Sequence, residues 1–151
     1  MHISARVDYA MRALVVLASS ENERLSCEAL AEAQQIPARF LEGILNQLRR
    51  AGIVVSRRGN EGGYLLGRPA REIMVADVIR ALDGPLAEVR GMRPEQSEYK
   101  GPVEPLKTVW VAARASLRGV LDHVSVADIA TGRLPKKVER LANSPEAWAV
   151  R

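Results

Sequence analysis

The spacing of apolar residues changes near residue 52 from the period of a helix to that of a pair of strands, and few folds accommodate such a change. Residues 37–51 carry apolar side chains every three or four positions, which predicts an amphipathic helix. Residues 53–57 are rich in β-branched side chains, residues 58–63 contain three glycines, and residues 64–67 return to apolar side chains, which predicts a β-hairpin. We therefore expect a mainly α-helical fold with a small antiparallel β wing.

Two further helices are predicted ahead of this unit. Apolar side chains at helical spacing predict the first over residues 4–20, and Ser26 is a suitable N-cap for a short second helix that reaches residue 34. A turn leads to Pro37, which the first position of a third helix tolerates. Three helices in this order, with a tight turn between the last two, predict a helix-turn-helix, and the hairpin that follows makes it a winged one.

The second half of the chain is also predicted to be helical. Helical patterns cover residues 75–82, 106–124 and 126–131, whereas residues 87–105 are polar and contain several glycines and prolines. Ser144 is a suitable cap for a short terminal helix. We expect four parts: a winged helix-turn-helix domain over residues 1–86, a loop over 87–105, a long and a short helix over 106–131, and a basic C-terminal tail over 132–151.

The composition is that of an ordinary globular protein. Of the 151 residues, 47% are hydrophobic and 26% are charged, and the chain is long enough to bury a core. No apolar run approaches the roughly 18 residues that cross a bilayer, and no leader pattern is recognisable, so we expect a soluble cytoplasmic protein. The single cysteine, Cys27, excludes an intrachain disulfide.

Charge is unevenly distributed along the first half of the chain. Residues 39–71 contain seven basic and two acidic side chains, whereas residues 8–32 contain five acidic and two basic ones. The net charge of +4 is weak support for a nucleic-acid partner by itself. A basic segment that coincides with a helix-turn-helix and its wing favours a surface directed at the phosphates of double-stranded DNA.

The polar face of the third helix offers groups that read bases. Arg39 can donate hydrogen bonds to guanine, and Glu42 can accept one from the amino group of cytosine. The amides of Asn46 and Gln47 could read adenine or contact phosphate. Arg49 and Arg50, further along the helix, are expected to contact the DNA backbone.

The tip of the hairpin has the chemistry of a DNA-binding wing. Arg57 and Arg58 lie beside glycine-rich sequence, and a narrow, A·T-rich minor groove attracts an inserted arginine. Gly59 and the glycines after it would let the backbone approach DNA closely. We expect Arg57, Arg58 and Gly59 to contact DNA.

Short motifs are spread over most of this region: YA at 9–10, RAL at 12–14, IP at 36–37, FLE at 40–42, LRRAG at 48–52, SRRG at 56–59, GGYLL at 62–66, DVI at 77–79 and DGPL at 83–86. Together they resemble the IscR/NsrR/CymR-type winged-helix regulators, which form the Rrf2 family. The resemblance is dense from residue 3 to about residue 86 and thinner as far as residue 131.

The resemblance implies a homodimeric transcription regulator on a pseudo-palindromic operator, and we expect a repressor. It implies that Arg39 and Glu42 read bases, that Arg58 enters the minor groove, and that Tyr9 belongs to the DNA-binding set. It also implies that residues 106–131 form dimerisation helices, and that the long one pairs with the same helix of a second subunit across a twofold axis. Its interface residues would be Leu106, Val109, Trp110, Ala113, Leu117, Val120, Leu121 and Val124.

The chain departs from many members of that family in its cysteines. Those members hold an iron–sulfur cluster with three cysteines in the loop before the dimerisation helix. Here residues 87–105 contain neither cysteine nor histidine, and Lys107 stands where some members have a histidine ligand. Asp8 matches a carboxylate ligand of one branch but cannot hold a cluster alone. We expect no cofactor and no metal site.

The signal is open at this stage. Cys27 could be a redox switch if the N-terminus of its helix lowers the thiol pKa, although lone cysteines are more often buried small residues. A small-molecule effector could bind at the dimer interface, in a pocket lined by Trp110 and residues 87–105. Regulation through a protein partner is a third possibility. The sequence contains no recognisable nucleophile–base pair and no phosphate-binding loop, so we do not expect an enzyme.

Overall fold

Aliphatic side chains of the first four helices pack into one core, as the computed structural model of residues 2–150 shows. These helices are α1 (Ala5–Ser19), α2 (Cys27–Gln34), α3 (Ala38–Arg50) and α4 (Val75–Leu82). Ala10, Ala13 and Leu14 of α1 are fully buried, because helical spacing places them on one face. Against them packs a stripe of α3 whose members are also buried: Leu41, Ile44, Leu45 and Leu48.

Local capping explains where these helices begin and end. The Ser26 hydroxyl accepts a hydrogen bond from the Ala29 amide at 3.0 Å, which confirms Ser26 as the N-cap of α2. Gln35, with a positive φ of 52°, ends α2 and opens the tight turn toward α3. Pro37 precedes α3 as its N-cap instead of occupying its first position, so the predicted start was one residue early.

The predicted hairpin is present. Strands β1 (Val54–Arg57) and β2 (Gly63–Leu66) pair antiparallel, with Val54 opposite Leu66 and Arg57 opposite Gly63. A residue outside the hairpin joins it, because the backbones of Leu25 and Tyr64 exchange hydrogen bonds of 3.2 and 2.8 Å. A Cβ atom on Gly63 would lie 2.8 Å from the Leu25 carbonyl oxygen, so this close approach requires glycine.

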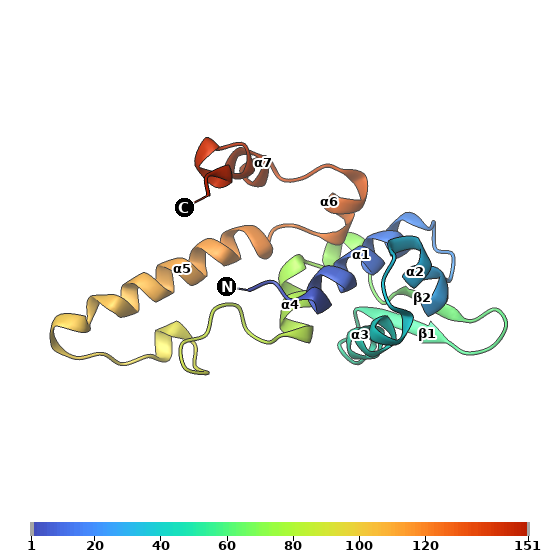
Figure 1. Ribbon diagram of the computed structural model, residues 1–151, viewed down its shortest axis with the longest axis horizontal. Coiled ribbons are helices and arrows are strands. Elements are labelled where there is room, and N and C mark those ends of the chain that lie inside the picture. Colours follow the sequence, from blue (N-terminus) through green and yellow to red (C-terminus); the bar gives the residue numbers. More distant parts are fainter. Residues whose placement is uncertain (1, 151) are drawn as a thin grey trace.

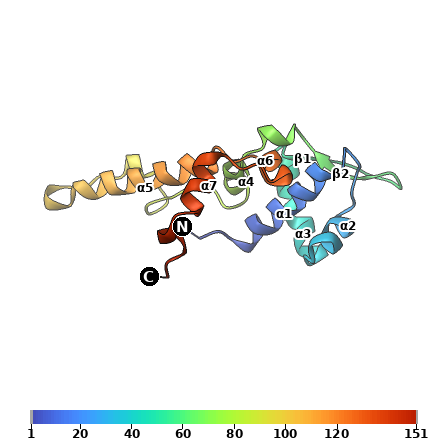
Figure 2. The same cartoon turned by 90° about the horizontal axis from the view of Figure 1, so that it is seen from above.

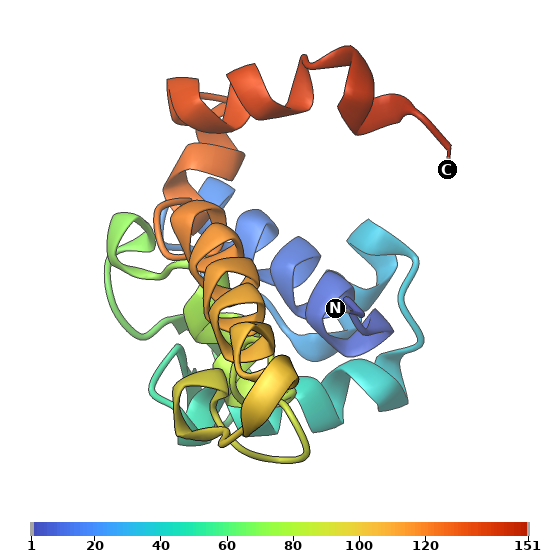
Figure 3. The same ribbon diagram turned by 90° about the vertical axis from the view of Figure 1, so that its left-hand side faces the viewer.

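The second half of the chain extends away from this core. Its elements are η1 (Ala70–Glu72), η2 (Pro94–Gln96), η3 (Gly101–Val103), α5 (Pro105–Leu121), α6 (Val126–Thr131), α7 (Lys136–Ala142) and η4 (Pro145–Trp148). Helix α5 projects from one end of the molecule and the hairpin from the opposite end (Figures 1 and 2). Viewed along α5, helix α7 and the C-terminus arch outward over the body (Figure 3). No helix among residues 2–150 combines the length and apolarity that spanning a membrane requires.

Helix α5 ends at Leu121, three residues earlier than predicted. The chain next takes up extended pairing with the segment before α4. The Val75 amide donates to the Val124 carbonyl, and the Val126 amide donates to the Ile73 carbonyl, both at 2.9 Å. Val124 is therefore off the helix and only 6% exposed, so its predicted place on the outer stripe of this helix is wrong. The tail holds α7, a helix that local patterns did not predict.

The foot of the hairpin yields a prediction about stability. A Cβ atom on Gly67 would lie 2.4 Å from the Gly52 carbonyl oxygen, which is rigid backbone. We expect Gly67→Ala to lower the free energy of unfolding by about 1–3 kcal/mol. Gly43→Ala, in open space in the middle of α3, should raise it by about 0.5–1 kcal/mol. Urea unfolding at one fixed protein concentration measures both, and equal stabilities for the two variants would contradict this account of the hairpin foot.

Candidate nucleic-acid interface

Helix α3 turns its polar face to solvent. Because its leucine stripe is buried in the core, Arg39 and Glu42 on the opposite side are exposed. Within residues 2–150, neither side chain takes part in an intramolecular hydrogen bond or ion pair. The two groups that sequence reasoning assigned to base reading are thus available to an external partner.

An aromatic contact fixes the start of α3 against α1. The rings of Tyr9 and Phe40 meet edge to face, with centroids 5.8 Å apart and planes at 89°. The Arg12 guanidinium lies over the Tyr9 ring, 5.1 Å from its centroid, and Arg12 Nε donates to Asp8 Oδ2 at 2.9 Å. Tyr9 is half-buried by these contacts, so it orients the first turn of α3 in addition to any contact it makes with DNA.

The remaining polar residues of α3 differ in their freedom. Asn46 and Gln47 are half-buried, and Arg6 of α1 donates a hydrogen bond to Gln47 Oε1. Arg49 Nη1 lies 3.5 Å from Ser56 Oγ, which links α3 to β1, and Arg50 is exposed. Sequence reasoning missed Arg6 because a contact across 41 residues leaves no local pattern.

The hairpin tip exposes its basic residues. Arg57, Arg58 and Gly59 are all exposed, and the Gly62 amide closes the turn by donating to the Gly59 carbonyl at 2.8 Å. A Cβ atom on Gly62 would lie 2.4 Å from the Arg57 carbonyl oxygen, so the tight turn requires glycine there. The arginines therefore stand at the end of a narrow, glycine-supported projection.

Cys27, at the start of α2, has the opposite chemistry to that of a reactive thiol. Its Sγ lies 3.5 Å from the Ala38 carbonyl oxygen. Burial raises the pKa of the Cys27 thiol above its ordinary value, and the carboxylates of Glu28 and Glu42 raise the pKa further. The raised pKa disfavours the alternative in which the helix N-terminus activates Cys27 as a redox switch, and it fits the commoner case of a lone, partly buried cysteine.

Helix α5 contains no fully buried residue, and its apolar side chains are either exposed or half-buried. Val109 and Trp110 are 53% and 37% exposed. An open cleft of about 430 Å³ lies between α4, the segment after it and α5. Its lining combines apolar groups with a few ionisable ones and contains neither lysine nor arginine: His2, Ile79, Asp83, Gly84, Pro85, Leu86, Ala87, Glu88, Val89, Pro94, Trp110, Ala113 and Leu117.

Comparison with known proteins identifies this arrangement. The sequence model of a family described as Rrf2, iron-dependent transcriptional regulator, matches residues 3–132. The chain belongs to the Rrf2 family. It is accordingly a DNA-binding transcription regulator with a winged helix-turn-helix, as the resemblance implied.

Relatives and solved structures agree with the Rrf2 assignment. A protein of Mycobacterium tuberculosis, provisionally named as an HTH-type transcriptional regulator, is 47% identical over 97% of this chain and 92% of its own length. The structure of CymR, the global cysteine regulator of B. subtilis, is 30% identical with a TM-score of 0.74, covering 87% of this chain and 98% of that one. The structure of T. potens IscR is 30% identical with a TM-score of 0.68, covering 100% and 93%.

The family description mentions iron, and the side chains of this Rrf2 protein do not fit an iron–sulfur cluster. Thiolates are the ligands such clusters require, and the loop over residues 87–105 has none. The sole thiol, Cys27, lies on α2, and Asp8 is engaged by Arg12. Within residues 2–150, no three histidine, cysteine, aspartate or glutamate side chains gather as a metal site would require.

The raised pKa of Cys27 gives a chemical test of the thiol in this Rrf2 protein. Since the thiolate is the reactive form, we expect folded protein to react with iodoacetamide at pH 7.5 more slowly than urea-unfolded protein. The rate should rise with a midpoint above the ordinary thiol pKa, and Glu28→Gln should move this midpoint down. Faster alkylation of the folded protein would show that the thiol is activated, contrary to this account.

Proposed function

We propose that this Rrf2-family protein is a repressor that binds a pseudo-palindromic operator as a homodimer and recognises its sequence. The observation that best supports the proposal is the separation of two elements with free surfaces. The hairpin with its exposed arginines projects from one end of the molecule and α5, which has no fully buried residue, from the opposite end (Figure 1). The polar face of α3 lies exposed in the body between them.

Base reading falls to the first turns of α3. Arg39 would donate to guanine and Glu42 would accept from cytosine, each contact contributing about 1–3 kcal/mol of discrimination. Their freedom from intramolecular partners supports this role, since no internal contact has to be broken first. Arg49, Arg50 and the free amide hydrogens of Gln47 would contact phosphates, which fixes register without reading sequence.

The hairpin tip would enter the minor groove that flanks each half-site. Arg58 would be inserted, with Arg57 and the backbone at Gly59 against the phosphates. Tyr9 would act through Phe40 by holding the first turn of α3 in place, and Asn46 would lie beside the bases nearest the centre of the groove. The assignments at the hairpin tip rest on exposure, and those of Tyr9 and Asn46 rest on their positions beside and on α3.

The dimer would form through α5, with residues 1–86 as the reading head and residues 106–131 as dimerisation helices. A monomer would leave the exposed apolar side chains of this helix, including Val109 and Trp110, in water, which disfavours that state. The interface set is the predicted one without Val124: Leu106, Val109, Trp110, Ala113, Leu117, Val120 and Leu121. Two copies related by a twofold axis would place their α3 helices about 34–36 Å apart, one turn of DNA.

The proposed regulator works without a metal or cofactor and is not an enzyme. The misfit between its donor groups and an iron–sulfur cluster supports the first point, and the naming of its relatives as transcription regulators supports the second. Because bacterial DNA lies in the cytoplasm, such a regulator would act there. The raised pKa of Cys27 disfavours a thiol switch.

The open cleft beside α5 is the site that we propose for a small-molecule effector. Trp110, Ala113 and Leu117 line it and also belong to the proposed dimer interface. A ligand here would shift α5 relative to α4 and so change the spacing of the two reading heads. In a Trp148→Phe background Trp110 is the sole tryptophan, and unchanged Trp110 fluorescence across candidate effectors would count against this site.

The rival proposal is that this protein regulates by binding a protein partner. The two proposals differ in whether the purified protein alone binds the DNA upstream of its own gene. Direct binding with an affinity that falls steeply with salt supports the regulator proposed here, since phosphate contacts release counterions. Binding that appears only after a second protein is added would support the partner instead.

Substitutions on the two DNA-reading elements should have different effects. Arg58→Ala should weaken binding about tenfold, or ~1.4 kcal/mol, mainly at operators with A·T-rich flanks, because it removes the inserted charge. Glu42→Ala should relax the base preference at one position of each half-site. Selection from randomised operators, followed by titration at one physiological salt concentration, measures both.

Arg71→Ala is the matched control for the lost charge. Arg71 is an exposed arginine on η1, outside α3 and the hairpin, so its removal should leave affinity within about twofold. The wing assignment fails if Arg58→Ala behaves like this control. The assignment of Glu42 fails if the selected operator profile is unchanged.

A further inference from the structure

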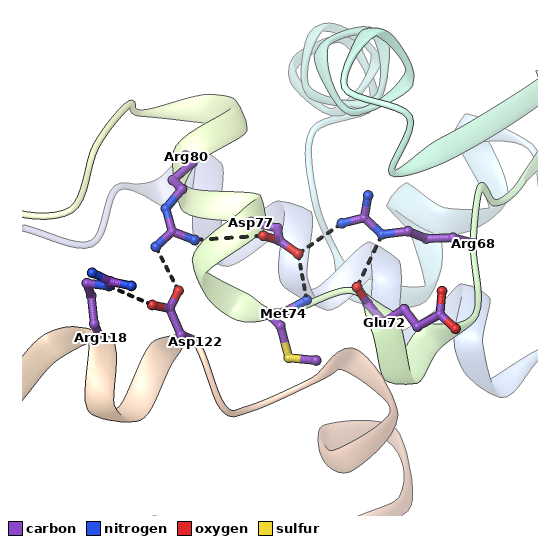
Figure 4. Close-up of polar contacts among 7 residues, drawn as sticks. All are labelled: Arg68, Glu72, Met74, Asp77, Arg80, Arg118 and Asp122. Carbon is purple, nitrogen blue, oxygen red and sulfur yellow. Dashed lines mark hydrogen bonds and ion pairs between the residues drawn. The ribbon is translucent and has the colours of Figure 1, made fainter.

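A continuous chain of ion pairs connects the foot of the hairpin to the end of α5 (Figure 4). It alternates in sign along five side chains: Arg68, Asp77, Arg80, Asp122 and Arg118. These residues come from three separate parts of the fold: the segment after β2, helix α4, and the C-terminal end of α5. The base-reading and dimerisation assignments do not use this chain.

At the hairpin end, Arg68 fastens the returning strand to α4. Its Nη2 donates to Asp77 Oδ2 at 2.9 Å, and its Nε donates to the Glu72 carbonyl at 3.2 Å. The same carboxylate oxygen accepts from the Met74 amide at 3.2 Å, which caps the first turn of α4. One residue before Arg68, the Gly67 amide donates to the Ile53 carbonyl at 2.8 Å, so both strands are held at this foot.

At the α5 end, Asp122 receives two arginines. Arg80 Nη2 donates to its Oδ1 at 2.7 Å, and Arg118 Nε donates to its Oδ2 at 2.8 Å. Arg80 also pairs with Asp77 Oδ1 at 3.8 Å, so a single guanidinium on α4 joins the two halves of the chain. Arg118 and Asp122 are one helical turn apart at the end of α5.

The chain is better placed than isolated surface ion pairs, which contribute little. The side chain of Asp122 is only 20% exposed and that of Asp77 only 34% exposed. Burial raises the pKa of Asp122, but the hydrogen bonds from Arg118 and Arg80 outweigh it and hold the pKa below its ordinary value. Asp122 is therefore ionised at neutral pH, and both of its oxygens are engaged.

We propose that Arg80 and Asp122 are positioning residues for DNA binding, because they transmit the orientation of α5 through Asp77 and Arg68 to the hairpin. Helix α5 has no fully buried residue, so apolar packing attaches it to the body less firmly than the core attaches α1 to α4. The ion pairs therefore contribute more to the orientation of α5 than they would for a buried helix. A shallow cleft lined by Arg68, Asp77, Arg80 and the α3–β1 junction residues Ala51 and Ile53 puts the middle of the chain beside the end of α3. A rotation of α5 would thus reach both reading elements.

The test removes the Arg80–Asp122 ion pair, which lies away from the proposed DNA-binding surface, and measures the effect on the hairpin and on operator affinity. Asp122→Asn and Arg80→Gln, each in the full-length homodimer, should lower operator affinity three- to tenfold. Amide hydrogen exchange of residues 54–66 should become several-fold faster in both variants. The double variant should be no worse than the weaker-binding single variant, since each substitution already breaks the Arg80–Asp122 contact through which the proposed link runs. Asp122→Glu, which keeps the charge, should restore most of the affinity.

Glu95→Gln is the matched control. It removes the partner of Arg114 on the same helix, an ion pair of 2.6 Å that connects α5 to η2 and not to the hairpin. We expect this variant to keep operator affinity and hairpin exchange within twofold of the wild type. Melting temperature and the dimer dissociation constant, measured for every variant, separate positioning from loss of folding or assembly.

Three results would overturn the proposal. One is an Asp122→Asn variant indistinguishable from Glu95→Gln in hairpin exchange. Another is a pair of substitutions whose effects on exchange simply add. The last is an affinity loss fully accounted for by weaker dimerisation. The inference rests on the proposed function, but hydrogen exchange requires no DNA, so a wild-type protein that bound no operator would refute that function and still leave the coupling measurable.

Discussion

Packing around α1 sets the position of the winged helix-turn-helix elements in this protein. Helices α2, α3, α4 and α6 all contact α1, and β2 contacts it as well. Fully buried Ala10 and Ala13 have no bulk beyond Cβ, which lets neighbouring helices approach closely. Because α3 lies with its leucines against this face, its polar side must point outward. The reading face is therefore a consequence of where the core lies.

Polar and aromatic contacts refine what the core establishes. The edge-to-face pair of Tyr9 and Phe40 fixes the first turn of α3, and Arg6 engages Gln47 further along. The backbone pairing of Leu25 with Tyr64 ties the hairpin to the segment before α2. Each contact joins one of the elements proposed to bind DNA to the body of the protein. An element held in this way keeps a set orientation, which suits entry into a groove in a set register.

The local elements were predictable because their signals are local. Helical spacing, the Ser26 cap and the glycines of the hairpin each act within a few residues, and the structure contains the helices and strands that they predict. The family followed from motifs of the same kind. Arg39, Glu42 and Arg58 lie exposed where the pattern predicted them.

The failures came from contacts that local patterns do not encode. Val124 continues the helical spacing of α5, yet its carbonyl pairs with Val75 almost fifty residues away, and that pairing ends the helix. The pKa of Cys27, which the sequence left open, depends on burial, on neighbouring Glu28 and on Glu42, a residue of another helix. The ion-pair chain through Arg80 and Asp122 joins positions 42 residues apart. An ion pair between residues so far apart in the sequence leaves no periodic pattern, so it can be recognised only in the folded structure.

The central claim is that two copies of the α3 reading head are held at a fixed distance through α5. Operator phasing tests it most directly, by measuring affinity for operators with extra base pairs between the half-sites. Five added pairs turn one half-site about half a helical turn away from its reading head, and about ten bring it back to the same face of the DNA. The account predicts a large loss of affinity with five pairs added and, because α5 also fixes the distance, no full recovery with ten. Affinity that does not depend on the spacing would contradict it.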